Sequence, residues 1–221
     1  MKVVVVAAHP DDETLGCGGS ILRHIENGDE VHWVIVTSMK PDAGYTAEQI
    51  TSRTEEIIAV GKAYGFSGTH RLDFPASSLD IVPLANVVSK MKLVFQHLEP
   101  EVVYTVFGGD SHSDHQVVYD AVCAASKWFR VGSIKSLLAY ETISETEMAL
   151  KPSATAFTPN VFIDIEKYLD RKLEIMSIYQ SEIGDFPFPR SNKAIRSLSA
   201  FRGSTVGSQA AEAFMLMRER R

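Results

Sequence analysis

Short apolar runs alternate with amphipathic segments along the first two-thirds of the chain. The apolar runs, typical of strands buried on both faces of a sheet, lie at 3–8, 31–37, 101–107 and 136–140. A shorter segment, 70–74, is predicted as a further strand. Apolar residues recur at helical spacing over 14–27, 47–64, 82–98 and 115–129. Strands that alternate with helices of this length predict an α/β fold, with a Rossmann-like, mainly parallel sheet flanked by helices.

The alternation changes after residue 142. The apolar segment 161–165 predicts a late strand at a sheet edge, and 166–180 and 209–218 are predicted as helices. Between these helices, the segment 184–207 is rich in glycine, proline and serine, which predicts a long active-site loop or lid. A length of 221 residues fits one domain, so we expect residues 1–221 to form a single domain.

Composition excludes several classes of protein. Hydrophobic residues make up 45% of the chain, which is enough for a sizeable core and too many for a disordered chain. The 22 basic and 28 acidic side chains leave a net charge of −6, which argues against a protein that holds nucleic acid by bulk attraction. The two cysteines, Cys17 and Cys123, form no C-x-x-C pair, which excludes a disulfide scaffold and a thiolate zinc finger.

The apolar run at 3–8 is too short to cross a membrane, because a spanning helix needs about 20 residues. It is also too short for the apolar part of a secretory signal, and no small-residue cleavage site follows it. We therefore expect a cytoplasmic protein with no stable membrane insertion.

Ionisable residues gather at two places, each directly after a predicted strand. The segment 9–13 (HPDDE) follows the first strand, and the segment 108–115 (GGDSHSDH) follows the strand at 101–107. In open parallel sheets, ligands bind outside the carboxyl ends of the strands. Both segments are therefore expected at the functional edge of the sheet.

These residue types suit a catalytic metal ion that is held without thiolates. A catalytic zinc takes three protein ligands and leaves one position for water, whose pKa falls to about 7. His9 and Asp12 can bind one ion from the first segment, a histidine of the second would complete the set, and Asp11 is placed to take the water proton. The alternative for HPDD is a turn in which an aspartate caps the next helix. Two such segments at strand ends of one domain favour the metal site.

The two segments also resemble a known family. The stretch 8–20 (AHPDDETLGCGGS), together with 112–115 (HSDH), resembles the PIG-L/LmbE-like N-acetylglucosaminyl deacetylases, which are zinc enzymes that remove acetyl from an amino sugar. Supporting matches are Arg53 with Glu56 (R-x-x-E) and the segment 202–214 (RG…G…AEAF). The resemblance covers most of the chain and implies the family's α/β fold.

The resemblance also implies roles for the residues of both segments. It implies that zinc is held by His9, Asp12 and His115, with one ion per chain and Fe²⁺ as the alternative ion. Asp11 would be the general base. His112, as a protonated imidazole, would stabilise the oxyanion or protonate the leaving amine.

Two roles stay open for Asp114, which we count among the catalytic residues. Its carboxylate would orient a histidine, as carboxylates beside metal ligands do. Alternatively, it would cap the helix that follows. The sequence favours neither role over the other.

Substrate contacts are expected from Arg53, Glu141 and Arg202. For Arg53 the alternative is a surface ion pair with Glu56 on the same helix. The loop at 37–44 (TSMKPDAG) departs from the family's T-x-G-E-x-G, which leaves room for a different substrate. Arginines that would suit an anionic aglycone are Arg190, Arg196 and Arg202.

The expected function is zinc-dependent hydrolysis of the N-acetyl group of an amino sugar of the N-acetylglucosamine type, or of its conjugate, with release of acetate. The expected partner is this small molecule, and homo-oligomers are compatible with the sequence. Two alternatives are a metal-dependent amidase acting on a larger acyl group or a non-sugar amide, and a non-catalytic sugar-binding module. The intact set of His and Asp residues argues against the module.

Overall fold

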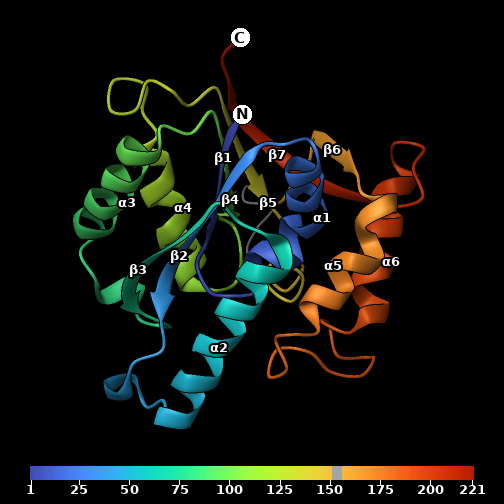
Figure 1. Ribbon diagram of the computed structural model, residues 1–221, viewed down its shortest axis with the longest axis horizontal. Helices are drawn as coiled ribbons and strands as arrows, with labels where there is room; N and C mark the ends of the chain where they lie inside the picture. Colours follow the sequence, from blue (N-terminus) through green and yellow to red (C-terminus); the bar gives the residue numbers. More distant parts are fainter. Residues whose placement is uncertain (151–155) are drawn as a thin grey trace.

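A seven-stranded sheet with helices on both faces organises the chain (Figure 1). The computed structural model describes residues 1–150 and 156–221. The strand order is β3-β2-β1-β4-β5-β7-β6. The strands are β1 (Lys2–Ala7), β2 (Glu30–Ser38), β3 (Gly68–Pro75), β4 (Val102–Val106), β5 (Ser136–Tyr140), β6 (Val161–Asp164) and β7 (Ala211–Glu219). The first five are parallel, and β7 runs antiparallel to both of its neighbours, β5 and β6.

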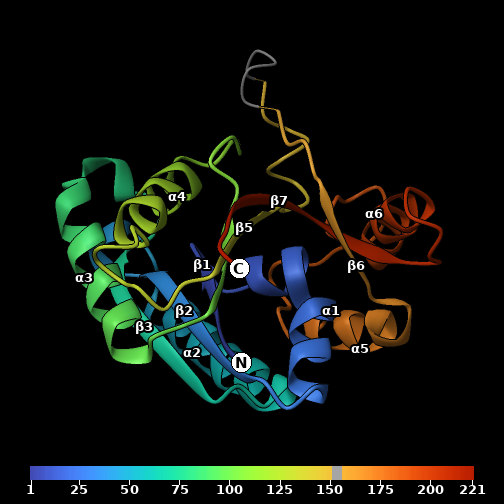
Figure 2. The same cartoon turned by 90° about the horizontal axis from the view of Figure 1, so that it is seen from above.

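In the part of the chain that the structure describes, six α-helices cover the sheet. They are α1 (Asp12–Glu26), α2 (Ala47–Tyr64), α3 (Leu84–Leu98), α4 (Ser113–Ala125), α5 (Leu169–Met176) and α6 (Asn192–Ser204). Short 3-10 turns lie at η1 (Pro41–Ala43), η2 (Leu79–Ile81) and η4 (Glu166–Tyr168). Helices α3 and α4 pack together on one face, while α1, α2 and α5 contact one another on the other (Figure 2). Among the described residues, no helix is both long and apolar enough to span a bilayer.

The strand order places the two functional segments side by side. The valines of β1 are completely buried between its parallel neighbours β2 and β4, as the continuous apolar run predicts. Chain order runs outward from β1 in both directions, to β2 and β3 on one side and to β4 and β5 on the other. Beyond the carboxyl ends of β1 and β4 the chain therefore diverges, and this is the place where open α/β sheets bind ligands.

Two predictions for the last third of the chain are wrong, while the edge strand predicted at 161–165 is confirmed as β6. The segment 209–218 forms strand β7 rather than a helix, because its backbone pairs with strands on both sides. The segment 184–207 is not one long loop, because most of it forms helix α6. Ser191 starts this helix by accepting a hydrogen bond from the Ala194 N–H at 3.2 Å.

A buried ion pair fixes helix α1, whose first turn carries the functional segment. The helix is interrupted at Cys17, which has non-helical angles. The Glu212 carboxylate, from β7, accepts the N–H groups of Gly19 and Ser20 just after this interruption, both at 2.8 Å. It also pairs with the ammonium of Lys172, from α5, at 2.7 Å. The middle of α1 is thus tied to the C-terminal third of the chain.

Candidate active site

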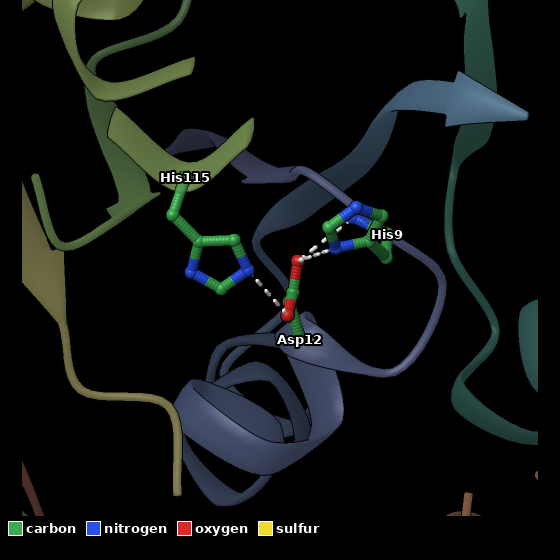
Figure 3. A group of neighbouring side chains, drawn as sticks. All are labelled: His9, Asp12 and His115. Atoms are coloured by element: carbon green, nitrogen blue, oxygen red, sulfur yellow. Dashed lines mark hydrogen bonds and ion pairs between the residues drawn. The ribbon is translucent and has the colours of Figure 1, made fainter. Parts of the chain in front are cut away.

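Three side chains from the two segments converge beyond the ends of β1 and β4 (Figure 3). His9 lies in the turn after β1, Asp12 begins α1, and His115 lies in the first turn of α4. One potential ligand atom of each lies within 4.8 Å of the others. His115 Nε2 is 3.2 Å from Asp12 Oδ1, and His9 Nδ1 is 3.7 Å from Asp12 Oδ2. Asp12 thus lies between the two imidazoles.

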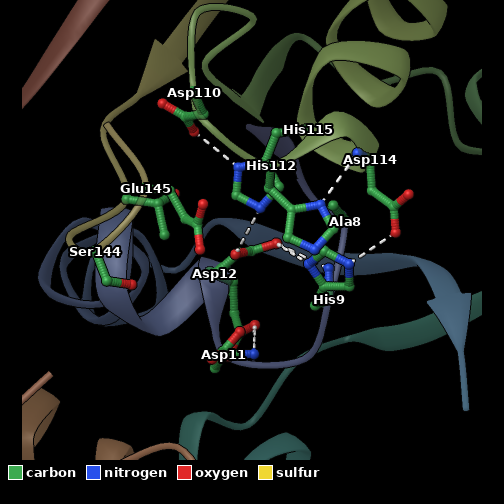
Figure 4. A network of polar contacts seen from close by, with 12 residues as sticks. Ala8, His9, Asp11, Asp12, Asp110, His112, Asp114, His115, Ser144 and Glu145 are labelled. Atoms are coloured by element: carbon green, nitrogen blue, oxygen red, sulfur yellow. Dashed lines mark hydrogen bonds and ion pairs between the residues drawn. The ribbon is translucent and has the colours of Figure 1, made fainter. Parts of the chain in front are cut away.

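Two carboxylates hold the outer nitrogens of these imidazoles (Figure 4). His9 Nε2 donates to Asp114 Oδ2 at 2.9 Å, and His115 Nδ1 donates to Asp110 Oδ2 at 2.7 Å. When each ring is neutral, as a metal ligand must be, its proton lies on this outer nitrogen and the inner nitrogen has its lone pair free for an ion. Without an ion, burial opposes protonation of His115, but Asp12 and Asp110 raise its pKa. Asp110 and Asp114 are both completely buried, so the two rings have fixed orientations.

The contacts of Asp114 distinguish between its two predicted roles. Its carboxylate accepts the N–H groups of Ser77 at 2.7 Å and Leu79 at 3.0 Å in addition to His9. The N-cap of α4 is His112 instead, whose Nδ1 accepts the Asp114 N–H at 3.1 Å. The geometry therefore favours an orienting role for Asp114.

The hydrogen bond from the Asp114 N–H also determines which nitrogen of His112 carries the proton. Because Nδ1 accepts a hydrogen bond from a backbone N–H, its ring proton lies on Nε2. Burial and the neighbouring His9 and His115 lower the pKa of His112. The protonated imidazole expected from the sequence does not fit this arrangement, which holds a neutral ring with one N–H to donate.

Asp11 has an unusual backbone and a crowded carboxylate. Its φ of 130° lies in a region that residues with a side chain rarely adopt. Its N–H donates to Glu13 Oε2 at 3.1 Å, and its Oδ2 accepts from Arg190 Nη1 at 3.0 Å. Burial and the neighbouring Asp12 carboxylate raise the pKa of Asp11, which favours its role as a proton acceptor. Burial opposes ionisation of Asp12 as well, but His115 and His9 lower its pKa.

A cavity of about 180 Å³ opens over these residues. The predicted site residues that line it are His9, Asp11, Asp12, Arg53, His112 and His115. Ser38 and Thr142 also line it, and their buried hydroxyls have no hydrogen-bond partner within the described part of the chain. Unpaired buried hydroxyls are costly unless a ligand or water completes them.

Arg53 borders the cavity and also pairs with Glu56. Its Nε lies 3.3 Å from Glu56, but the pair is largely buried rather than on the surface. Its Nη1 donates to the carbonyl of Pro10 at 3.0 Å, and Nη2 bonds Glu182. Arg53 therefore supports the functional turn at Pro10 as well as bordering the cavity.

The structure does not bring Glu141 and Arg202 to the cavity. Nε and Nη2 of Arg202 donate to the two carboxylate oxygens of Glu141 at 2.8 and 2.6 Å. Neither residue is among those that line the cavity. Because each satisfies the other, this pair supports the junction of β5 and α6 and not a substrate contact.

Sequence reasoning missed three residues that contact the site, and it gave a fourth, Arg190, a different role. Asp110 stood in the predicted segment without a role, although its spacing of five from His115 could have suggested one. Tyr179 donates to Glu13 at 2.8 Å, and Glu182 accepts from Arg190 at 2.6 Å. Arg190, considered for an aglycone, lines the cavity and also contacts Asp11. These last three residues approach from a distant part of the chain, so no local pattern could reveal their contacts.

The donor set fits a divalent transition metal ion. Two imidazole nitrogens with fixed lone pairs and one carboxylate provide the nitrogen and oxygen ligands that Zn²⁺ takes in catalytic sites. The same set accepts Fe²⁺. Potential ligand atoms of His9, His112 and Asp114 also lie within 4.8 Å of one another. In this second group, however, His9 Nε2 is hydrogen-bonded to the Asp114 carboxylate, and His112 Nδ1 accepts the Asp114 N–H.

Comparisons with known proteins show the family of the chain. Residues 4–126, more than half of the chain, match the family model PIG-L, described as GlcNAc-PI de-N-acetylase. An uncharacterised deacetylase of Escherichia coli (strain K12), YaiS, is 29% identical over 81% of this chain and 90% of its own length. The diacetylchitobiose deacetylase of Thermococcus kodakarensis is 25% identical over 96% of this chain and 81% of its own length.

The fold comparison covers almost the whole chain. The crystal structure of the conserved protein TT1542 from Thermus thermophilus matches with a TM-score of 0.78 and 25% identity. The match covers 99% of this chain and 95% of that protein, and includes the mostly parallel seven-stranded sheet. Together, the family model, these relatives and the fold show that the chain belongs to the PIG-L family of deacetylases.

Proposed function

We propose that this chain is a metal-dependent hydrolase that removes the N-acetyl group from an amino sugar of the N-acetylglucosamine type, or from its conjugate, and releases acetate. One observation carries the proposal: the ligand set of His9, Asp12 and His115 lies in one cavity with the carboxylate of Asp11. Membership of the deacetylase family and the names of both relatives support the same reaction.

The metal ion would be held by His9 Nδ1, the Asp12 carboxylate and His115 Nε2. Zn²⁺ is our first choice and Fe²⁺ the alternative. When bound, such an ion polarises a carbonyl oxygen and lowers the pKa of a water molecule to about 7. Asp110 and Asp114 keep both imidazoles in the orientation that this binding needs.

Asp11 moves the proton. Its carboxylate accepts a proton from the attacking water and returns it to the nitrogen of the departing amine. The hydrolysis then balances: water supplies a hydroxyl to the acyl carbon and a proton to the amine, and the C–N bond breaks. The positive φ of Asp11 keeps its side chain at the cavity, next to the ligand Asp12.

His112 stabilises charge without giving up its proton. The neutral ring keeps its proton on Nε2 because Nδ1 is occupied by the Asp114 N–H. This Nε2–H can donate to the oxyanion that develops on the acetyl carbonyl. The proposal therefore assigns His112 to oxyanion binding and Asp11 to both proton transfers.

The size of the cavity favours a small acyl group. Its volume of about 180 Å³ lies below the roughly 300–1,000 Å³ typical of pockets for drug-sized ligands. An acetyl group and one sugar ring suit this space better than a long acyl chain. Polar groups on its wall, which include Arg53, Ser38 and Thr142, can hydrogen-bond the hydroxyls of a sugar, although apolar side chains such as Ile50 and Ile57 line it as well.

The test is acyl release from two series of compounds by zinc-loaded protein. The first series varies the acyl group on glucosamine from acetyl to butanoyl and octanoyl. The second keeps the acetamide and varies the rest: N-acetylglucosamine, diacetylchitobiose, inositol-linked and nucleotide-linked forms, and N-acetyl-lysine. We expect the highest kcat/KM for an acetylated sugar and a steep loss with acyl length. Preference for octanoyl or for N-acetyl-lysine would establish the amidase, and binding without turnover the non-catalytic module.

A further inference from the structure

We propose that Arg190 is a positioning residue that fixes the carboxylate of Asp11 for proton transfer. The inference rests on the proposed function, and it assigns a role that the sequence pattern does not suggest. Arg190 was expected to bind an anionic part of the substrate. Arg190 does line the cavity, but its guanidinium is hydrogen-bonded to Asp11, which is 179 positions away in the chain.

The backbone of Asp11 needs support from outside its own turn. With φ at 130°, the residue is in a conformation that persists only where surrounding contacts hold it. One support is Glu13, whose Oε2 accepts the Asp11 N–H at 3.1 Å. Glu13 is itself completely buried and is held at Oε1 by the hydroxyls of Thr14 at 2.6 Å and Tyr179 at 2.8 Å. These contacts fix the main chain of Asp11 but leave its carboxylate free to rotate.

Arg190 supplies the missing support. Its Nη1 donates to Asp11 Oδ2 at 3.0 Å and to Glu182 Oε2 at 2.6 Å, while its Nε donates to Ser144 Oγ at 2.9 Å. A planar guanidinium held on two sides has a defined direction, which a lysine ammonium cannot reproduce. With Oδ2 engaged, rotation about the Asp11 Cβ–Cγ bond is restricted, which favours one direction for Oδ1.

The segment around Arg190 is anchored at both ends. Ser191, the next residue, caps helix α6. Glu182, which accepts from Arg190, also bonds Arg53, and Arg53 donates to the carbonyl of Pro10, directly before Asp11. The guanidinium and the turn that carries Asp11 are therefore parts of one network. A misplacement of about 1 Å in such a network can cost about 100-fold in rate.

A substrate-binding role makes a different prediction. If Arg190 held an anionic group of the substrate, its loss would raise KM and leave kcat nearly unchanged. If it positions Asp11, its loss lowers kcat and leaves KM and metal affinity unchanged. The two roles are therefore separated by kinetics with one substrate.

The experiment compares Arg190→Met and Arg190→Lys with wild type in zinc-loaded protein, using the acetylated sugar with the highest wild-type activity. Arg171→Met is the matched control, because this exposed arginine pairs with Glu174 on the same helix and does not line the cavity. We expect Arg190→Met to lower kcat by about 10- to 100-fold, with KM within about two-fold and unchanged zinc content and Tm. The kcat of Arg190→Lys should lie between those of wild type and Arg190→Met. Millimolar guanidinium should partly restore the kcat of Arg190→Met.

Coupling to Asp11 provides the decisive readout. In an Asp11→Asn background, Arg190→Met should cause no further loss, because a residue that acts through Asp11 has nothing left to position. A crystal structure of Arg190→Met should also show the Asp11 carboxylate turned from its wild-type direction. Raised KM with unchanged kcat, additive losses in the double variant, or an unmoved carboxylate would each overturn the inference. Absence of acetate release from wild type would instead overturn the proposed function itself.

Discussion

Asp114 accepts a hydrogen bond from His9 Nε2 at 2.9 Å, although the two residues are 105 positions apart. The contact is a consequence of strand order, because β1 and β4 are neighbours in the sheet and their carboxyl ends meet. The carboxylate is fixed by two backbone N–H groups, so it can hold the imidazole in one orientation and one tautomer. This relationship connects the sheet topology with the proposed metal site.

The first prediction concerns this contact. Asp114→Asn should weaken zinc binding by about 10- to 100-fold, because the amide no longer holds His9 with Nδ1 free. Competition with a chelator of known affinity measures the change. Asp120→Asn, an exposed aspartate on the same helix, is the control and should bind zinc like wild type. Equal zinc affinity in Asp114→Asn and wild type would contradict the orienting role.

Asp110 should act on His115 in the same way. Asp110→Asn removes the charge that holds His115 Nδ1–H at 2.7 Å, and we expect a loss of zinc affinity of the same order, about 10- to 100-fold. Thr146→Val provides a graded comparison, because the Thr146 hydroxyl donates to the other oxygen of Asp110 at 2.7 Å. The expected order of affinity is wild type, Thr146→Val, then Asp110→Asn. The reverse order would argue that Asp110 has no part in metal binding.

Substitution of Asp11 should lower activity without affecting metal binding. Asp11→Asn should keep zinc, because Asp11 is not in the ligand set, and should lose on the order of 100-fold or more in kcat as the proton acceptor is removed. Zinc content by elemental analysis and acetate release measure the two quantities on one sample. Wild-type turnover in Asp11→Asn would remove Asp11 from proton transfer.

The sequence predicts the strands and helices that have local patterns. The valine run of β1, and the two segments that follow β1 and β4, suffice to place His9, Asp12 and His115 at one edge of the sheet. Strand β7 lacks such a pattern, because its identity comes from pairing with β5 and β6.

The parts of the site that escaped prediction depend on distant residues. The guanidinium of Arg190 meets Asp11 only after the segment before α6 has folded back onto the first turn of α1. Similarly, the Nδ1 contact that keeps His112 neutral depends on the start of helix α4 and not on residue type. Residue types and the family resemblance therefore predicted which side chains gather at this edge of the sheet, but they did not predict the protonation state of His112 or the contacts that support Asp11.

A structural prediction tests how α1 is anchored. Glu212→Gln removes the charge opposite the buried ammonium of Lys172, and an uncompensated buried charge costs about 3–5 kcal/mol. Urea unfolding should show this loss, and the double variant Lys172→Met/Glu212→Gln should recover part of it. Glu219→Gln on the same strand, whose partner Arg221 is exposed, should leave the free energy of unfolding unchanged. Equal stability of Glu212→Gln and wild type would contradict the role of this pair.

The central claim is that His9, Asp12 and His115 hold an ion on which deacetylation depends. Its most direct test is acetate release by chelator-treated protein during titration with zinc, in wild type and in His115→Ala. We expect wild-type activity to vanish on chelation and to return with one equivalent of zinc, while His115→Ala neither retains zinc nor recovers. Acetate release that survives chelation, or that is unchanged in His115→Ala, would contradict the claim.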